Sequence, residues 1–278
     1  MSFASGGGAH AQSTMMVQQA IVGQIHEARR AAALRFRLTF AFVWILIIVG
    51  IILSLSAANA WNWEFVFESG PVIVLQGAGI TILVSAVSIV GATILAVLGA
   101  LGRISGNAVL FAISSFYVSL IRGTPLIVQI YIIYFALPQL GIVIPAIPAG
   151  ILALSLNYGA YMTEIFRAGI QAIPRGQREA AGALGMREGH IMRRIVLPQA
   201  VRIVTPAIGN EFIAMLKDSA LVSIISVHDT LFMAQRLGRS TFNPVTALLI
   251  AAIVYWILTI IFSIFQERLE KRMARGDR

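Results

Sequence analysis

The sequence contains no cysteine among its 278 residues, which excludes disulfides and cysteine-ligated metal sites. Its four histidines are scattered, and none has the i, i+4 partner expected of a helical zinc site. The sequence also contains no G-x-S-x-G nucleophile motif. We therefore predict no metal site, no cofactor bound by this chain and no catalytic residue.

Lysine is nearly absent as well, since Lys217 and Lys271 are the only two. A phosphate-binding loop needs a Gly-Lys-Ser/Thr sequence, because the lysine must reach the terminal phosphates of the nucleotide. Leu216 precedes the first lysine and Glu270 precedes the second, so neither fits. The chain is therefore not a self-contained ATPase, and any ATP-driven activity requires a separate subunit.

Charged residues make up only 12% of the chain, whereas soluble domains carry roughly 25%. Hydrophobic residues make up 58%, and the mean hydropathy is +0.84. The apolar residues fall in continuous blocks of about 20, the length that crosses a hydrocarbon core of ~30 Å. A transmembrane β-barrel would show short alternating segments instead. The sequence therefore predicts an all-α, polytopic membrane protein.

The net charge of +9 is distributed asymmetrically. Of the 21 Lys and Arg residues, 17 lie in segments that can all face the cytoplasm: four before residue 38, Arg103, seven from Arg167 to Arg202, and five from Arg268 onward. This is the bias that orients membrane proteins, and it argues against a nucleic-acid partner. It predicts a multi-pass protein with both termini in the cytoplasm.

We predict about six transmembrane helices. Residues 1–37 form a cytoplasmic segment, and 38–57 form an additional N-terminal span. A signal peptide is the competing interpretation of 38–57, but this run exceeds the 7–15 residues of a signal core. Five spans lie within 72–265, which includes a polar cytoplasmic loop at 170–205. Residues 266–278 form a basic cytoplasmic tail.

A break is expected at Arg122-Gly123-Thr124-Pro125, inside the third hydrophobic region. Proline removes a backbone donor, and glycine loosens the helix. Irregular backbone at membrane depth is tolerated only where it is buried in protein or lines a cavity. The break therefore marks a segment with one of these two surroundings.

Charges also occur in the segment from Ala207 to Val227, which we count as a span because the basic tail would otherwise lie outside. A charge at the bilayer centre costs about 2.5–3.5 kcal/mol on insertion scales, so Glu211, Lys217 and Asp218 should avoid lipid. Glu211 and Asp218 are seven residues apart and share a helical face. They could meet the ammonium of an amino acid, with Lys217 or Arg122 meeting its carboxylate. Alternatively, these charges pair internally or lie at the wet cytoplasmic edge.

The cytoplasmic loop contains a short predicted helix at Gln177–Leu184. Glu179 lies near the positive end of its dipole, and Gly185 can end it in a left-handed conformation. Such a short helix does not stabilise itself in water, so a docking partner is expected.

In this loop, Glu179-Ala180-Ala181 followed by Gly185 and Leu197-Pro198 resembles the EAA loop of binding-protein-dependent ABC importer permeases. The resemblance implies a type I ABC importer permease-like core of five helices, to which the N-terminal helix is an addition. It also implies that the loop helix is a coupling helix for a cytoplasmic ATPase. The coupling residues would be Gln177, Arg178, Glu179, Ala180, Ala181, Gly182, Leu184 and Gly185.

Further segments are similar to the polar amino-acid branch, the histidine/glutamine type. These are Arg122–Gln129, Asn157–Tyr161, Glu164–Arg167, Gly209–Phe212 and Leu216–Leu221. Candidate residues of the substrate path are Arg122, Thr124, Gln129, Asn157, Tyr161, Glu164, Glu211, Lys217 and Asp218. The uncharged candidates could equally hold helices together, because polar side chains do so in membrane bundles.

The family resemblance implies a permease in the bacterial inner membrane. Its partners would be membrane lipid, two copies of an ATPase that uses ATP and Mg²⁺, a second permease that is either itself or a paralogue, and an extracytoplasmic solute-binding protein. The substrate would be a polar amino acid. The alternative is an ion-coupled secondary transporter or channel, which needs no docking helix. A structural membrane subunit without a transport path is a third possibility.

Overall fold

The computed structural model describes residues 7–57 and 61–274, with side chains described at 29–30, 32–57 and 61–273. It divides the chain into two units, Met1–Trp61 and Asn62–Arg278. Three parts of the sequence lie outside the described residues: the start of the predicted N-terminal segment (1–6), the residues that directly follow the predicted N-terminal span (58–60) and the end of the tail (275–278).

The first unit contains one long helix, α1 (Gly7–Ala57). No proline interrupts this range, so the basic segment and the apolar run that follows it form one continuous helix. Its part from Ala32 to Ala57 is long and apolar enough to cross a membrane. At 1.5 Å per residue, the uncharged run 38–57 is about 30 Å long, which matches a hydrocarbon core.

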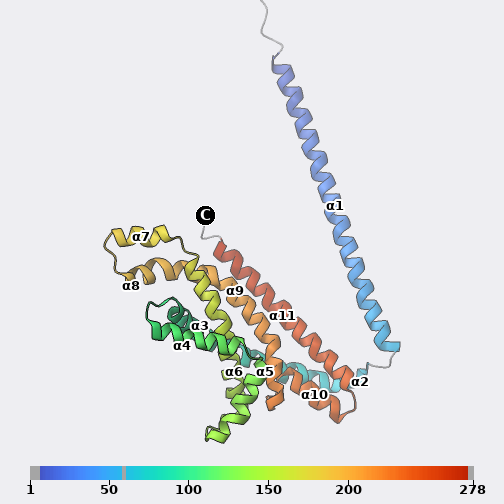
Figure 1. Cartoon of the computed structure of the whole chain (residues 1–278). Helices are drawn as coiled ribbons and strands as arrows, with labels where there is room; N and C mark the ends of the chain where they lie inside the picture. Colours follow the sequence, from blue (N-terminus) through green and yellow to red (C-terminus); the bar gives the residue numbers. More distant parts are fainter. Residues whose placement is uncertain (1–6, 58–60, 275–278) are drawn as a thin grey trace, which may run out of the picture. The chain divides into compact units, whose positions relative to one another are not determined.

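The second unit is a bundle of helices with short π-helical and 3-10 segments between them (Figure 1). The α-helices are α2 (Trp63–Val72), α3 (Ala78–Ile104), α4 (Ala108–Arg122), α5 (Leu126–Tyr131), α6 (Ala146–Gln171), α7 (Arg175–Ala183), α8 (Glu188–Ile191), α9 (Leu197–Asp218), α10 (Thr230–Ser240) and α11 (Pro244–Ala274). The π-helical segments are η1 (Ile73–Gly77), η2 (Ile132–Ala136) and η4 (Met192–Val196), and the 3-10 segments are η3 (Leu137–Leu140) and η5 (Ser219–Ile225).

The main core lies between α3 and α6, and small residues bring these helices close together. Ala92, Ala96 and Ala100 of α3 are fully buried in this core. On α6, a Cβ atom at Gly159 would lie 2.7 Å from the Tyr117 hydroxyl and 2.9 Å from the Leu95 Cβ. The close approach of α6 to α3 and α4 therefore depends on a missing side chain.

The all-α, polytopic prediction is confirmed. By length and composition, three of the described helical segments could span a membrane: Ala32–Ala57, Trp63–Ile104 and Pro244–Met273. A fourth is added when α4 and the bent segment after it are counted together. The helices α6 and α9 do not qualify on hydropathy, because they carry the polar and charged residues that the sequence marks as path candidates. α6 is largely buried in the bundle, whereas α9 buries only Ala200, Val204, Met215 and Leu216.

The predicted break is present. α4 ends at Arg122, α5 begins at Leu126, and the segments on either side are bent by 105°. Pro125 precedes the first residue of α5, where its missing N–H costs little. The chain therefore changes direction inside a hydrophobic region.

A second cluster joins α2, η1, α10 and α11, and a fully buried carboxylate lies beside it. Asp229 caps the N-terminus of α10, where its Oδ1 accepts a hydrogen bond of 2.9 Å from the Phe232 N–H. Its Oδ2 accepts a bond of 2.9 Å from the Tyr255 hydroxyl on α11. Beside it, the Thr81 and Thr230 hydroxyls lie 2.9 Å apart. Asp229 thus ties the start of α10 to α11.

Candidate functional site

Gln129 and Thr124 supply hydrogen bonds that the break between α4 and α5 would otherwise lack. The Thr124 hydroxyl lies 2.9 Å from the Leu120 carbonyl oxygen and 3.4 Å from that of Ile121. In a regular helix the Ile121 carbonyl would accept from residue 125, but Pro125 has no N–H. The Gln129 Nε2 lies 2.8 Å from the Ile121 carbonyl oxygen, 3.1 Å from that of Thr124 and 2.9 Å from the Thr124 hydroxyl. Asn157 of α6 donates a bond of 3.2 Å to the Gln129 Oε1. Three path candidates are thus brought together in one network, in which Gln129 and Asn157 are buried and Thr124 is half-buried.

Arg122 and Tyr161 are also brought together, at the same end of α4. The guanidinium carbon lies 5.1 Å from the centre of the Tyr161 ring, which is a cation–π distance. Both side chains are exposed. They are therefore accessible to a solute, unlike the buried amides of Gln129 and Asn157.

Two of the charged path candidates, Lys217 and Asp218, lie at the C-terminal end of α9. Asp218 is its last residue, and the Asp218 Oδ2 accepts a hydrogen bond of 2.7 Å from the Tyr158 hydroxyl on α6. Lys217 and Asp218 are exposed, whereas Glu211 is half-buried. An exposed carboxylate held by a phenol can meet an ammonium group. Lys217 is the neighbouring residue in the helix, so it faces a different direction from Asp218.

Glu164 has its counterions within the chain. Its Oε1 lies 3.3 Å from the Arg103 Nε, and its Oε2 lies 2.7 Å from an Arg167 guanidinium nitrogen. Arg103 also donates a bond of 2.6 Å to the Ser115 hydroxyl. This ion network ties α6 to α3 and α4, so its geometry favours the bundle-holding role for Glu164.

The predicted loop helix is α7, and its end has a defined geometry. Gly185 has φ +77°, its N–H donates to the Gly182 carbonyl (2.9 Å), and the Met186 N–H donates to the Ala181 carbonyl (3.1 Å). These bonds form a Schellman motif, which requires the left-handed residue that the sequence places there. Leu184, just before this turn, is 83% exposed.

The bundle braces α7 on its inner face. Ala181 is buried in a small cluster with residues before and after α7, including Ile170 and Val196. The Arg178 Nη2 donates a bond of 3.2 Å to the Ile170 carbonyl near the end of α6. The Gln177 Oε1 accepts a bond of 2.6 Å from the Gln199 amide on α9. The outer residues Glu179, Ala180, Gly182, Leu184 and Gly185 are exposed. In Figure 1, α7 and α8 lie beyond the ends of α6 and α9.

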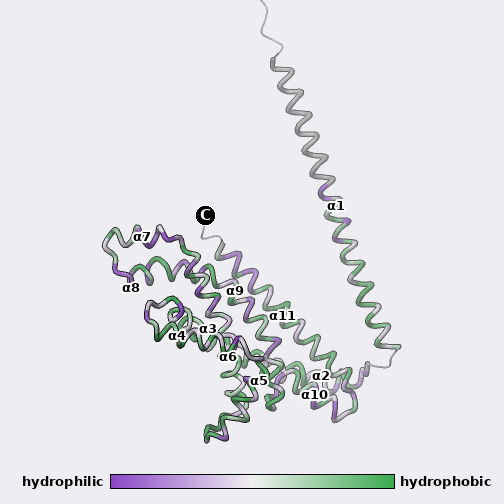
Figure 2. The backbone as a smooth tube through the Cα atoms, in the orientation of Figure 1, coloured by the Kyte–Doolittle hydropathy of each residue, from purple (hydrophilic) through white to green (hydrophobic). Residues whose placement is uncertain are grey.

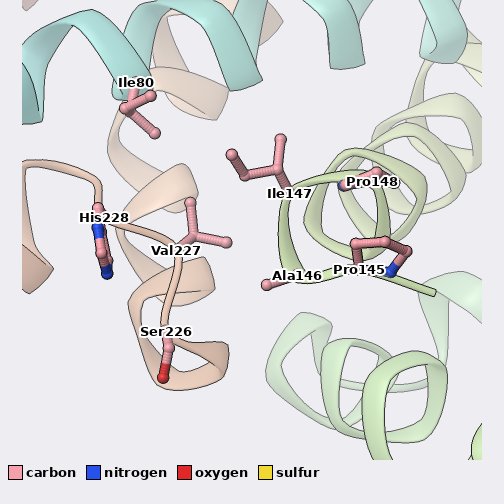
Figure 3. Close-up of a pocket in the computed structure, with 8 residues that line it drawn as sticks. All are labelled: Ile80, Pro145, Ala146, Ile147, Pro148, Ser226, Val227 and His228. Atoms are coloured by element: carbon pink, nitrogen blue, oxygen red, sulfur yellow. The ribbon is translucent and has the colours of Figure 1, made fainter. Parts of the chain in front are cut away.

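A pocket of about 420 Å³ lies between the start of α6 and the loop before α10 (Figure 3). Its lining is almost entirely apolar, and none of the path candidates belongs to it. The lining residues are Ile80, Pro145, Ala146, Ile147, Pro148, Ser226, Val227 and His228. It lacks the opposed charges that a zwitterionic solute requires.

Residues 92–275 match the family described as binding-protein-dependent transport system inner membrane component. The chain belongs to this family. The permease is 41% identical over 205 residues to the arginine transport system permease protein ArtQ of Bacillus subtilis (strain 168), covering 73% of this chain and 94% of ArtQ. It is 38% identical over 213 residues to the putative glutamine transport system permease protein GlnP of Rickettsia bellii (strain RML369-C), covering 76% of this chain and 98% of GlnP.

Solved structures agree with this assignment. The permease superimposes with a TM-score of 0.71 and 37% identity on a chain of an amino acid ABC transporter crystallised with histidines, covering 76% of this chain and 98% of that one. A chain of the MetNI methionine ABC transporter in an inward-facing conformation gives a TM-score of 0.63 at 20% identity, which shows a shared fold alone. The predicted type I importer permease fold is therefore confirmed.

Three residues of these networks are absent from the predicted site. Sequence reasoning treats Arg103 only as an orienting charge, and it leaves out Tyr158 and Gln199. Tyr158 carried a usable signal, because it directly follows Asn157 in a segment similar to the amino-acid branch. Gln199 carried none, since its contact with Gln177 joins residues 22 positions apart through the folded loop of the permease.

Proposed function

We propose that this chain is the membrane-spanning permease subunit of an ABC importer for polar amino acids. In this proposal it lies in the bacterial inner membrane with both termini in the cytoplasm. It pairs with itself or a paralogue, binds two copies of a cytoplasmic ATPase, and receives its substrate from an extracytoplasmic binding protein. Family membership supports a transport role, and the amino-acid relatives support the substrate class.

The ATP-driven part of the proposal rests on helix α7, which is held against the bundle on one face and exposed on the other. The Leu184 side chain is 83% exposed and so buries little apolar surface against the bundle. Ala181, on the inner face of α7, is only 4% exposed. An exposed leucine next to a capped helix end is the kind of apolar anchor that fits a pocket on a partner protein. We assign this pocket to the ATPase subunit, and any ATP and Mg²⁺ are used there.

The hydrogen bonds that hold α7 against the bundle can also transmit movement from the ATPase subunits to the transmembrane helices. When the ATPase subunits close, a push on α7 reaches α6 through Arg178 and the Ile170 carbonyl. It reaches α9 through Gln177 and Gln199. Because α6 and α9 carry Asn157, Tyr158 and Asp218, the movement changes the geometry of the candidate path. This mechanism is alternating access, in which the bundle switches between two packed states.

The candidate path suits a small zwitterion better than an anion. Asp218 and half-buried Glu211 can meet an ammonium group, and Lys217 or Arg122 can meet a carboxylate. Relatives named for arginine, glutamine and L-cystine transport share 38–41% identity with this chain, so the class is polar amino acids.

The test is a Leu184→Ser variant, compared with wild type in proteoliposomes that contain the ATPase and the binding protein. We expect weaker ATPase binding and slower uptake, with an unchanged melting temperature of the isolated permease, because Leu184 contributes little buried area. Leu140→Ser is the matched control, since Leu140 is 76% exposed at the end of η3, in a different part of the bundle sequence. Uptake that continues without any ATPase subunit would instead favour an ion-coupled carrier.

A further inference from the structure

The helix α1 lies outside the matched family region, residues 92–275. The curated relatives also leave about a quarter of this chain unmatched while they are themselves covered at 94–98%. Membership of the family therefore assigns no role to α1. A role for α1 has to be inferred from the residues of this helix.

Four arginines stand at the start of the apolar run: Arg29, Arg30, Arg35 and Arg37. The sequence contains no Asp or Glu between Arg30 and Trp63. The nearest acidic residue in the sequence is Glu27, which lies three positions before Arg30, so Arg35 and Arg37 are the arginines farthest from an acidic residue. Figure 2 shows hydrophilic colour where the described side chains of α1 begin and mainly hydrophobic colour after it. All four side chains are exposed. The positive charge is therefore concentrated at one end of a membrane-spanning segment.

Helical geometry places most of this charge on one face. At about 100° per residue, Arg30 and Arg37 lie within about 20° of each other, two turns apart. Arg29 lies within about 100° of both, whereas Arg35 points to the other side of the helix. The three arginines on one side form what we call the basic face of α1.

An aromatic stripe continues from the basic face along the helix. Phe36 and Phe40 have ring centres 6.4 Å apart, and Phe40 and Trp44 have ring centres 5.8 Å apart. Their spacing of four residues places the rings within about 80° of each other, on the side that Arg29 and Arg37 share. Their exposed fractions are 72%, 55% and 44%, respectively. One side of α1 thus carries cations from Arg29 to Arg37 and apolar rings from Phe36 to Trp44, and the two sets overlap at Phe36 and Arg37.

We propose that this side of α1 binds an anionic phospholipid. Arg37 directly precedes the 20-residue apolar run, so its guanidinium lies at the depth of the lipid phosphates, where it can bind a phosphate bidentately. Arg30 lies about 10 Å further from the hydrocarbon, within the range in which a negative lipid surface attracts cations. The acyl chains of the same lipid pack on Phe40 and Trp44. The proposal requires only that α1 spans a membrane, so it can fail without affecting the importer function.

The test compares binding of phosphatidylglycerol and phosphatidylcholine with identical acyl chains to the purified full chain, by native mass spectrometry. We expect wild type to prefer phosphatidylglycerol. Arg30→Gln/Arg37→Gln should lower that affinity by about 25-fold, since each basic residue near an anionic surface strengthens binding about fivefold. The matched control is Arg268→Gln/Arg272→Gln, which removes two exposed charges from α11 and should change it little. An equal loss in both variants, or no loss in the first, overturns the proposal.

Fluorescence quenching tests the acyl part. Phosphatidylglycerol brominated on its chains should quench the Trp44 emission, measured as the difference between wild type and Trp44→Phe. Quenching that is equally strong with brominated phosphatidylcholine argues against headgroup selection at this face. If neither lipid quenches Trp44, a protein surface covers the stripe, for instance that of a second copy, and the proposal is wrong.

Discussion

Asn157 donates a hydrogen bond of 3.2 Å to the side-chain oxygen of Gln129, and both amides are buried. The other end of the Gln129 amide donates to the backbone at the break between α4 and α5. A helix interruption in a hydrophobic region is thus completed by two side chains from different helices. This relationship decides how substitutions at both positions should behave.

Gln129→Leu should destabilise the protein, because it leaves the Thr124 carbonyl without its donor and the Ile121 carbonyl with only the longer 3.4 Å bond from the Thr124 hydroxyl. The expected loss is about 1–3 kcal/mol, the penalty for buried acceptors that lose a partner. The measurement is the melting temperature in detergent, with Gln139→Leu as the control, since Gln139 is exposed. An unchanged melting temperature together with a raised apparent KM for uptake would show that Gln129 binds substrate and does not hold the break.

Asp218→Asn should lower uptake more than protein level. The asparagine oxygen can still accept from the Tyr158 hydroxyl, but the negative charge that meets an ammonium group is lost. We expect about a tenfold loss of apparent affinity, which corresponds to one charged hydrogen bond. Glu211→Gln should act in the same direction, and Glu188→Gln on exposed α8 is the control. Unchanged uptake in both path variants would remove these carboxylates from the path.

Arg178→Met should uncouple ATP hydrolysis from transport. It removes the bond between α7 and the Ile170 carbonyl at the end of α6, while the half-buried aliphatic part of the side chain is retained. The ratio of amino acid transported to ATP hydrolysed should fall severalfold, with a change in stability of about 1 kcal/mol. Arg175→Met, at an exposed position of the same helix, should leave this ratio unchanged. Equal ratios in the two variants would contradict the route through Ile170.

Asp229 makes the stability of the protein depend on pH. Burial raises the pKa of its carboxyl from 3.8 to about 6, although the bonds from Phe232 and Tyr255 act in the opposite direction. Because the folded state binds this proton more tightly than the unfolded state, stability decreases as pH rises from about 4 to about 6. The decrease should be on the order of 3 kcal/mol, at 1.36 kcal/mol per pKa unit.

The measurement is the melting temperature of wild type and of Asp229→Asn between pH 4 and pH 7. The difference between the two curves cancels every other titrating group. It should change steadily up to about pH 6 and stay constant above it. Parallel curves over the whole range would show that Asp229 does not titrate there.

Gly159→Ala should destabilise the protein by about 1–3 kcal/mol, as overpacking of a tight core does. The added methyl group would approach the Tyr117 hydroxyl and the Leu95 Cβ, and Tyr117 is itself held by a 2.7 Å bond to the Leu156 carbonyl. Gly79→Ala is the matched control, since a Cβ there meets nothing within 4 Å. It should instead stabilise α3 by about 0.5–1 kcal/mol. A stable Gly159→Ala protein would mean that α6 can move away from α3 without cost.

Local chemistry made several features predictable from sequence. Pro125 and Gly123 predict the break because they change the backbone wherever they occur. Gly185 predicts the end of α7 because a left-handed residue must follow that helix. The continuity of α1 through the basic segment was not predicted, although the absence of proline in that range is consistent with it.

The partners of the site residues could not be predicted in the same way. The sequence alone indicates that Glu164 is charged and lies in a helix. Its distance from Arg103, however, depends on how α3 packs against α6. The partner of Gln129 could not be predicted either, because its bond to the Ile121 carbonyl forms only when the chain folds back over eight residues. Sequence therefore identifies which residues are unusual in a membrane, whereas the packing decides whether each is paired within the chain or open to a solute.

The amide network at the break also has a consequence for biogenesis. Gln129 can reach the Ile121 carbonyl as soon as α5 has formed, because the two residues are only eight positions apart. Its own oxygen has no donor from Asn157 until α6 emerges from the ribosome 28 residues later. We therefore expect the insertion machinery to retain α4 and α5 until α6 is made and to release the three helices into lipid together.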